Sequence, residues 1–108
     1  ITVEDQARAD ERIPIMVGLP RLWLSMEPLL GAVSLPDAHL GGLNWIIGGG
    51  ESGPRARPMD LAWVRSLRDQ ASRAGVPYFV KQLGGHPDAR TDIADFPADL
   101  QIQEVPRG

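Results

Sequence analysis

Three glycines stand at the spacing G-x-G-x-x-G directly after an apolar run: Gly48, Gly50 and Gly53. This is the spacing of a dinucleotide-binding loop, in which a bare backbone lets a pyrophosphate approach the start of a helix. Glu51 lies inside the loop and would repel a diphosphate at close range. Two prolines separate the glycines from the next helical pattern, and Lys81 ends the following strand where an acid about 20 residues on should hold a ribose. The motif therefore does not predict a dinucleotide site.

Two other roles fit the same glycines, and the sequence leaves both open. In the first, residues 48–50 let a ligand approach the backbone, Glu51 accepts hydrogen bonds from its polar groups, and Arg55 and Arg57 meet a carboxylate or a phosphate. In the second, the glycines form a bulge that packs against a neighbouring element, and the arginines lie at the surface.

The elements that must position these residues are short. Apolar runs predict four strands, at residues 1–3, 21–26, 43–47 and 77–82. Helical periodicity predicts a helix over 6–18, which Pro14 should break, and a second helix over 60–74. Asp60 is a suitable N-cap for the second helix and Gly75 a suitable C-terminal stop. Glycine and proline predict two segments without regular structure: 29–42 as a loop and 84–108 as a largely irregular tail.

The order of these elements, β-α-β-loop-β-α-β, predicts an α/β fold with a parallel sheet. In parallel α/β folds, ligands bind at the carboxyl ends of the strands. Charged or amide side chains stand at four such ends: Glu4, Glu27, Glu51 and the pair Lys81-Gln82. We interpret them as one shared site. The alternative is that strands simply end at polar residues.

Composition limits the classes of protein and site. The 108 residues allow a single small domain or a fragment of a larger one. A net charge of −3 gives no electrostatic footprint for nucleic acid, and no apolar run approaches the ~20 residues of a membrane span. Cysteine is absent, and His39 and His86 are isolated, so no metal site is predicted. A cytoplasmic location is the default expectation.

Ile1 begins the chain inside an apparent strand, which suggests that the N-terminal part of a longer protein is missing.

Several short motifs occur in one order along the chain. They are V-E-D-Q at 3–6, A-D-E-R-I-P at 9–14, E-P-L-L-G at 27–31, G-G-E-S-G at 49–53, A-R-P-M at 56–59, W-V-R at 63–65, R-D-Q at 68–70, and G-V-P at 75–77 followed by Phe79 and Lys81-Gln82. Together they resemble the phage gp thirty-seven/gp sixty-eight family, which is found in phages and bacteria. The resemblance spans the whole chain.

The resemblance implies a fold and a cofactor system. Members of this family are longer and look like radical S-adenosylmethionine proteins, with three cysteines in their N-terminal half spaced to hold a 4Fe–4S cluster. This chain would be only the C-terminal half, a partial (half) TIM-type barrel of about four parallel strands with flanking helices. S-adenosylmethionine and the 4Fe–4S cluster are implied for the full-length family. This chain alone should bind no cluster, because it has no thiolate ligand.

Two residues depart from the family's pattern at the predicted strand ends. Gly48 stands where a strand valine is expected, and should loosen the end of its strand. Met26 stands where a small residue is usual, and should narrow the site.

We therefore predict the C-terminal portion of a radical-S-adenosylmethionine-like protein, which supplies substrate and cofactor contacts but no cluster. In this site Glu27 and Glu51 would hold polar groups of the ligand, and Lys81 an anionic group. The predicted ligand contacts are Glu4, Glu27, Gly49, Gly50, Glu51, Ser52, Arg57, Lys81 and Gln82; no catalytic residue is assigned. Two alternatives stay open: a non-catalytic remnant or ligand- or partner-binding module, and a small phosphate- or nucleotide-binding domain that uses residues 48–53.

Partners follow from the same prediction. They are the missing N-terminal half or a partner chain, for which the three-cysteine-motif partner protein found beside family members is a candidate; no membrane contact is predicted, and nucleic acid is left open. Four strands cannot close a barrel, since eight strands and about 250 residues are typical. The chain should be an open sheet with bare strand edges and a bare apolar helix-facing surface. We expect it not to be a well-behaved monomer, and we favour association with the missing half over a natural homodimer.

Overall fold

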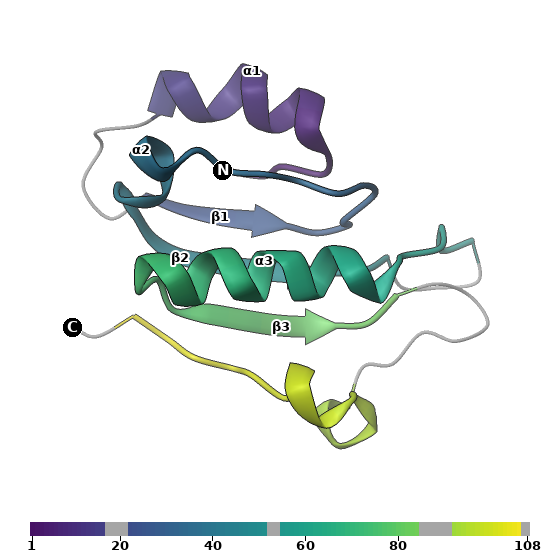
Figure 1. Cartoon of the computed structure of the whole chain (residues 1–108). Helices are drawn as coiled ribbons and strands as arrows, with labels where there is room; N and C mark the ends of the chain where they lie inside the picture. Colours follow the sequence, from purple (N-terminus) through teal and green to yellow (C-terminus); the bar gives the residue numbers. More distant parts are fainter. Residues whose placement is uncertain (17–21, 52–54, 85–91, 107–108) are drawn as a thin grey trace.

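A computed structural model describes residues 1–16, 22–51, 55–84 and 92–106. Three strands form one parallel sheet in the order β1-β2-β3 (Figure 1): β1 (Leu22–Met26), β2 (Leu43–Gly49) and β3 (Tyr78–Gln82). In this register Leu24 lies beside Ile46, and Ile46 lies beside Tyr78. The predicted α/β class is therefore confirmed as a small domain with a three-stranded parallel sheet and flanking helices.

The first predicted strand is reduced to a single bridge. Thr2 pairs in parallel with Ser25 of β1, where Val3 N donates to Ser25 O at 2.9 Å and Ser25 N donates to Ile1 O at 2.8 Å. The chain then turns into helix α1 (Gln6–Met16). The prediction of four strands is therefore wrong for residues 1–3, because the helix begins too soon after the bridge for a ladder to extend.

Helix α3 (Leu61–Ala74) is the one that the periodicity predicts. The Asp60 carboxylate caps it by accepting a hydrogen bond from Ala62 N at 2.9 Å. Gly75 ends it at a φ of 71°, in the left-handed region that favours glycine. Both predicted signals at the ends of this helix are confirmed.

Two other expectations about helices are corrected. Helix α1 continues through Pro14 to Met16, because a proline this close to the end of a helix removes few backbone hydrogen bonds. Residues 29–42, predicted as loop, contain the four-residue helix α2 (Asp37–Leu40) with Leu40 buried. A single turn is too short to show helical periodicity in a sequence. Residues 17 and 18, the predicted end of the first helix, lie outside the described residues.

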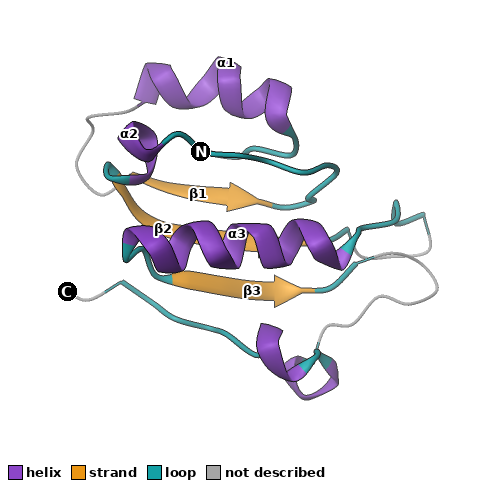
Figure 2. Cartoon of the chain, viewed as in Figure 1, coloured by secondary structure: helices purple, strands orange, loops and turns teal. Residues whose placement is uncertain are grey.

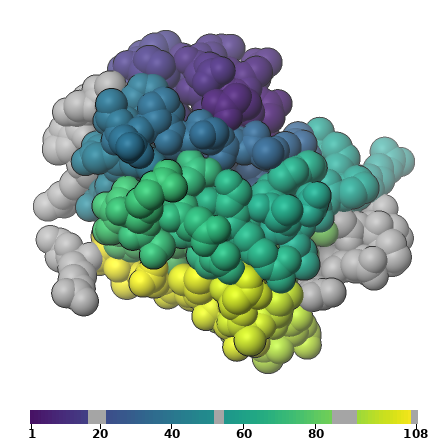
Figure 3. Space-filling view, in the orientation of Figure 1, coloured from purple at the N-terminus to yellow at the C-terminus, as the bar shows by residue number. Residues whose placement is uncertain are grey.

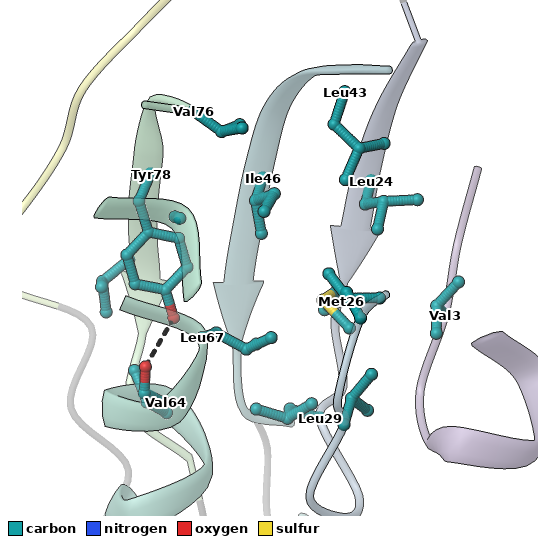
Figure 4. Close-up of a cluster of buried hydrophobic side chains, with 14 of the residues drawn as sticks. Val3, Leu24, Met26, Leu29, Leu43, Ile46, Val64, Leu67, Val76 and Tyr78 are labelled. Carbon is teal, nitrogen blue, oxygen red and sulfur yellow. Dashed lines mark hydrogen bonds between the residues drawn. The ribbon is translucent and has the colours of Figure 1, made fainter. Parts of the chain in front are cut away.

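One face of the sheet carries the hydrophobic core. Val64 and Leu67 of α3 are buried against it, and the Tyr78 hydroxyl donates to Val64 O at 3.1 Å (Figure 4). Burial raises the pKa of the Tyr78 phenol above its usual range. The buried strand side chains of this core are Leu22, Leu24, Met26, Leu43, Ile46, Tyr78 and Val80.

The core explains both departures from the family's pattern. A Cβ on Gly48 would lie only 2.8 Å from the Tyr78 hydroxyl, so the tyrosine ring takes the space of the expected valine. Gly48 therefore allows close packing at the end of β2 and does not loosen it. Met26 has 0% of its surface exposed and lies in the core, so it does not narrow a site at the strand ends.

The opposite face of the sheet is partly open. Trp23, Trp45 and Phe79 form a row across the three strands, with ring centroids 5.8 Å and 6.0 Å apart. Trp23 is 44% exposed, and Trp45, Ile47 and Phe79 are half-buried. We call these four residues the aromatic face. Helix α3 lies against the other face of the sheet (Figure 2), and Ala9 and Ile13 of α1 are buried in the same core. The expectation of a bare helix-facing surface is therefore wrong, because that surface is covered, while the aromatic face is partly exposed within the described residues.

The tail covers the outer edge of β3. Gln103 forms an antiparallel bridge with Phe79, and Val80 N donates to Ile102 O at 2.8 Å. This edge is therefore not bare, contrary to expectation. Figure 3 shows the tail packed along one side of α3. Before it reaches β3, the described part of the tail makes two short 3₁₀ turns: η1 (Ile93–Asp95) and η2 (Ala98–Leu100).

Candidate functional site

Backbone hydrogen bonds join the segments that leave the carboxyl ends of the sheet. Leu30 N donates to Glu4 O at 2.8 Å, which ties the segment after β1 to the N-terminal segment. Gly50 N donates to Gln82 O at 3.1 Å, which ties the segments after β2 and β3. The predicted site residues at strand ends thus lie at one edge of the sheet. We call it the carboxyl edge, comprising residues 4, 27–30, 49–51 and 81–82.

Glu51 is held by Arg57 through both carboxylate oxygens. Its Oε1 accepts hydrogen bonds from the backbone N–H of Arg57 at 2.9 Å and from Nε at 3.0 Å, and Oε2 accepts from Nη2 at 2.7 Å. The side-chain hydrogen bonds of Arg57, helped by its backbone N–H, lower the pKa of Glu51 to about 2. Glu51 is therefore ionised at neutral pH and suits charge pairing more than proton transfer.

Glu4 pairs with Arg12 of helix α1. Arg12 Nη1 lies 3.3 Å from Glu4 Oε2 and donates to Thr2 O at 2.7 Å. Glu51 and, more weakly, Glu4 raise the pKa of Arg57. Glu4 therefore acts on the charge of Arg57 in addition to its own ion pair with Arg12. Sequence reasoning missed Arg12, because a helical arginine gives no sign of which strand end it will reach.

Glu27 and Lys81 form the third ion pair of the carboxyl edge. Lys81 Nζ donates to Glu27 Oε1 at 3.3 Å and joins the ends of β1 and β3 across β2. Each of the three glutamates that the sequence placed at strand ends therefore contacts a cation of the same chain.

Gly49 and Gly50 are packed against the end of β3. A Cβ on Gly50 would overlap Gly84 Cα, and a Cβ on Gly49 would lie 3.3 Å from Gln82 O. Gln82 also donates from its side-chain amide to Gly50 O, and Leu29 N donates to Gly49 O at 2.8 Å. This packing fits the second role considered for the glycines. That a ligand also approaches their backbone stays a prediction.

The positions of two residues considered from the sequence, and the possibility of a metal site, complete the description of the candidates. Ser52 and His86 lie outside the described residues. Within the described ranges, no three His, Cys, Asp or Glu residues are grouped so that they could hold a metal ion. Over the same ranges, no helix has the length and apolar character that crossing a membrane requires.

Comparison with known proteins gives one match. Residues 1–103 match the model of a family described as Protein of unknown function (DUF5131). No curated protein and no solved structure matches the chain significantly. The matched range includes every residue of the carboxyl edge and nearly the whole chain, so the protein belongs to DUF5131, a family of unknown function.

Proposed function

We propose that this chain is the C-terminal portion of a radical-S-adenosylmethionine-like protein of the phage gp thirty-seven/gp sixty-eight type, and that its carboxyl edge contacts substrate and cofactor. One observation carries the proposal: the two faces of the parallel sheet differ. Helices cover one face, and the other bears Trp23, Trp45 and Phe79 partly open. Parallel sheets are usually buried on both faces, so the aromatic face fits the inner side of a larger α/β unit.

The edges of the sheet favour an incomplete barrel. Residues 1–3 and the three strands provide four parallel segments, half of the eight in a closed barrel. The antiparallel contact of Gln103 with Phe79 occupies the β3 edge, so a further parallel strand cannot pair there unless the tail leaves. Growth of the sheet is therefore favoured at the Thr2 edge. We therefore propose a partial barrel in which β3 is the last parallel strand and the tail occupies its outer edge.

The cluster must be held outside this chain. A 4Fe–4S cluster takes cysteine thiolates as ligands, and these 108 residues contain no cysteine. The residues of this chain therefore do not fit the cluster, and no reaction step is assigned to it here. What the chain can supply is polar contacts to S-adenosylmethionine or substrate from the carboxyl edge.

The missing ligands should come from an N-terminal half or from a partner chain, for which a three-cysteine-motif partner protein is a candidate. The coding sequence directly upstream tests this. An in-frame C-x₃-C-x₂-C tract would support the proposal, and anaerobic reconstitution of that longer protein should then yield stoichiometric iron and sulfide, whereas the 108-residue chain should take up neither. A cluster on the short chain, or the lack of such a tract in the gene and in any co-purifying partner, would contradict it.

The alternative is a non-catalytic ligand- or partner-binding module. The ion pairs favour this non-catalytic module, because Glu4, Glu27 and Glu51 each contact a cation of the chain. None of these three glutamates is therefore an unpaired carboxylate that could transfer a proton. Binding of S-adenosylmethionine with no reductive cleavage, in the longest native form of the protein, would favour this module over the enzyme.

A further inference from the structure

We propose that Arg57, together with Arg12, binds an oxyanion group of the ligand, a carboxylate or a phosphate, and that Glu51 and Glu4 act as anchors that hold these two guanidinium groups. The inference rests on the proposed function only in placing a ligand at the carboxyl edge. It changes the role expected for Glu51, from a ligand contact to a positioning residue.

The exposure of the ion pairs carries the inference. In each pair of the carboxyl edge the cation is the more exposed partner: 58% for Arg57 against 28% for Glu51, and 37% for Arg12 against 25% for Glu4. The third pair of the edge, Lys81 with Glu27, shows the same order, 56% against 24%. The acids lie beneath, and the cationic groups face solvent.

The other ion pairs of the described residues do not share this order. Asp99 is 44% exposed, against 39% for Arg65 and 28% for Arg68, and Asp69 is 66% exposed. At α1, Arg8 is no more exposed than either of its acidic partners. Exposed cations over partly buried acids are thus a property of the carboxyl edge and not of arginine pairs in general.

Arg57 has donors to spare. A guanidinium carries five N–H groups in a planar fork. Glu51 accepts hydrogen bonds from Nε and Nη2 of Arg57, while Nη1 makes no hydrogen bond to the described residues. Among the residues that the structure places, Arg12 likewise donates only through Nη1, to Glu4 and to Thr2 O. A carboxylate or phosphate matches the planar donor pattern of such groups, and anchoring by Glu51 orients the Arg57 fork before a ligand arrives.

The charges of the carboxyl edge and of the whole chain determine the distance over which an anion is attracted. The two anchors neutralise the two arginines, and the chain carries a net charge of −3, so long-range attraction of an anion is weak. Binding should depend on short charge-assisted hydrogen bonds, and so should discriminate an oxyanion from chloride at equal ionic strength.

The test is a titration of the full ¹⁵N-labelled chain with inorganic phosphate and, in a parallel arm, with acetate. Sodium chloride keeps the ionic strength constant, and the side-chain Nε–H signals of the arginines are followed by NMR. We expect saturable shifts of Arg57 and Arg12. The arm with the tighter binding identifies whether the oxyanion is a phosphate or a carboxylate. No saturable shift in either arm would overturn the proposal.

Variants separate a site from general surface attraction. Arg57→Gln should weaken binding about tenfold, the usual loss for one or two charge-assisted hydrogen bonds, and Arg57→Lys should weaken it less. Arg65→Gln is the matched control, because Arg65 also pairs with a carboxylate, that of Asp99, but on α3. Equal losses in Arg57→Gln and Arg65→Gln would overturn the proposal. Neither the absence of saturable shifts nor equal losses in the two variants bears on the upstream cysteine tract. Failure of this proposal can therefore be distinguished from failure of the proposed function.

Discussion

The two faces of the sheet are built from the same strands and differ in what covers them. On one face Leu24 and Ile46 are 0% exposed beneath the helices. On the other, Trp23 is 44% exposed, although it directly precedes Leu24 in β1. Alternation of side chains along a strand sends neighbours to opposite faces. The comparison shows that one face holds this domain together, while the other has the apolar character of a buried surface without being fully covered.

Ring geometry indicates what the open face is suited to. The planes of Trp23 and Trp45 are tilted by 44°, and those of Trp45 and Phe79 stand at 87°. Because one pair is tilted and the other is packed edge to face, the three rings do not form one flat platform of the kind on which successive bases stack. The aromatic face is therefore better suited to apolar side chains of another layer, as the proposed barrel requires.

Truncating two neighbouring residues of β1 that lie on opposite faces should give the largest difference in stability. Leu24→Ala should cost about 2–5 kcal/mol of unfolding free energy, because it leaves a cavity in a packed core. Trp23→Ala should cost clearly less in the isolated chain, since its ring is already partly in solvent. Urea denaturation of both variants measures the difference. Equal losses would show that the open face also supports the fold.

Gly50→Ala tests the close packing at the carboxyl edge. Its new Cβ would overlap the backbone of Gly84, and we expect a loss of about 1–3 kcal/mol from overpacking. Gly41→Ala is the matched control, because its Cβ would lie 3.6 Å from the nearest atom outside its neighbours and its φ is −62°. Thermal unfolding of the two variants gives the measurement. A neutral Gly50→Ala would show that the gap between these segments can open without cost.

Tyr78→Phe and Phe79→Tyr compare one hydroxyl on each face. Removing the Tyr78 hydroxyl loses the bond to Val64 O and should cost about 0.5–1.5 kcal/mol. Adding a hydroxyl at the half-buried Phe79 should change the free energy of unfolding by less than that. If the order of the two effects is reversed in chemical denaturation, the assignment of the faces is contradicted.

The smallest expected effect is on titration. A ¹³C-carboxyl NMR titration should give a pKa of about 2 for Glu51, and Arg57→Gln should raise that pKa toward the ordinary value of 4.5. Because the pKa is lowered in the folded chain, the pair stabilises the fold above the pKa of the unfolded carboxyl. That contribution is lost as the pH falls toward about 2. An unshifted Glu51 in the wild type would contradict the anchor role.

Much of the fold could be predicted from the sequence because it is locally encoded. Helix α3 has its periodicity and both end signals, Asp60 and Gly75, within the element itself. Helix α2 is a single turn, and the contact of Gln103 with Phe79 joins residues far apart in the chain, so neither leaves a local pattern.

The site was predictable in part for the same reason. Parallel strands bring their carboxyl ends to one edge, so the common location of Glu4, Glu27 and Glu51 follows from topology. The choice of partner for each carboxylate does not, because it depends on where long side chains reach. Arg12 reaches Glu4 from a helix, and no spacing rule indicated that pairing.

Sedimentation of the 108-residue chain tests most directly whether the aromatic face is an interface. We predict that the chain associates increasingly as its concentration rises, and that Trp23→Ser reduces this association. Ile15→Ser is the control, because Ile15 is 78% exposed on α1 and should not contribute. A wild-type chain that stays a cooperatively unfolding monomer at high micromolar concentration would contradict the proposal that this sheet is one part of a larger unit.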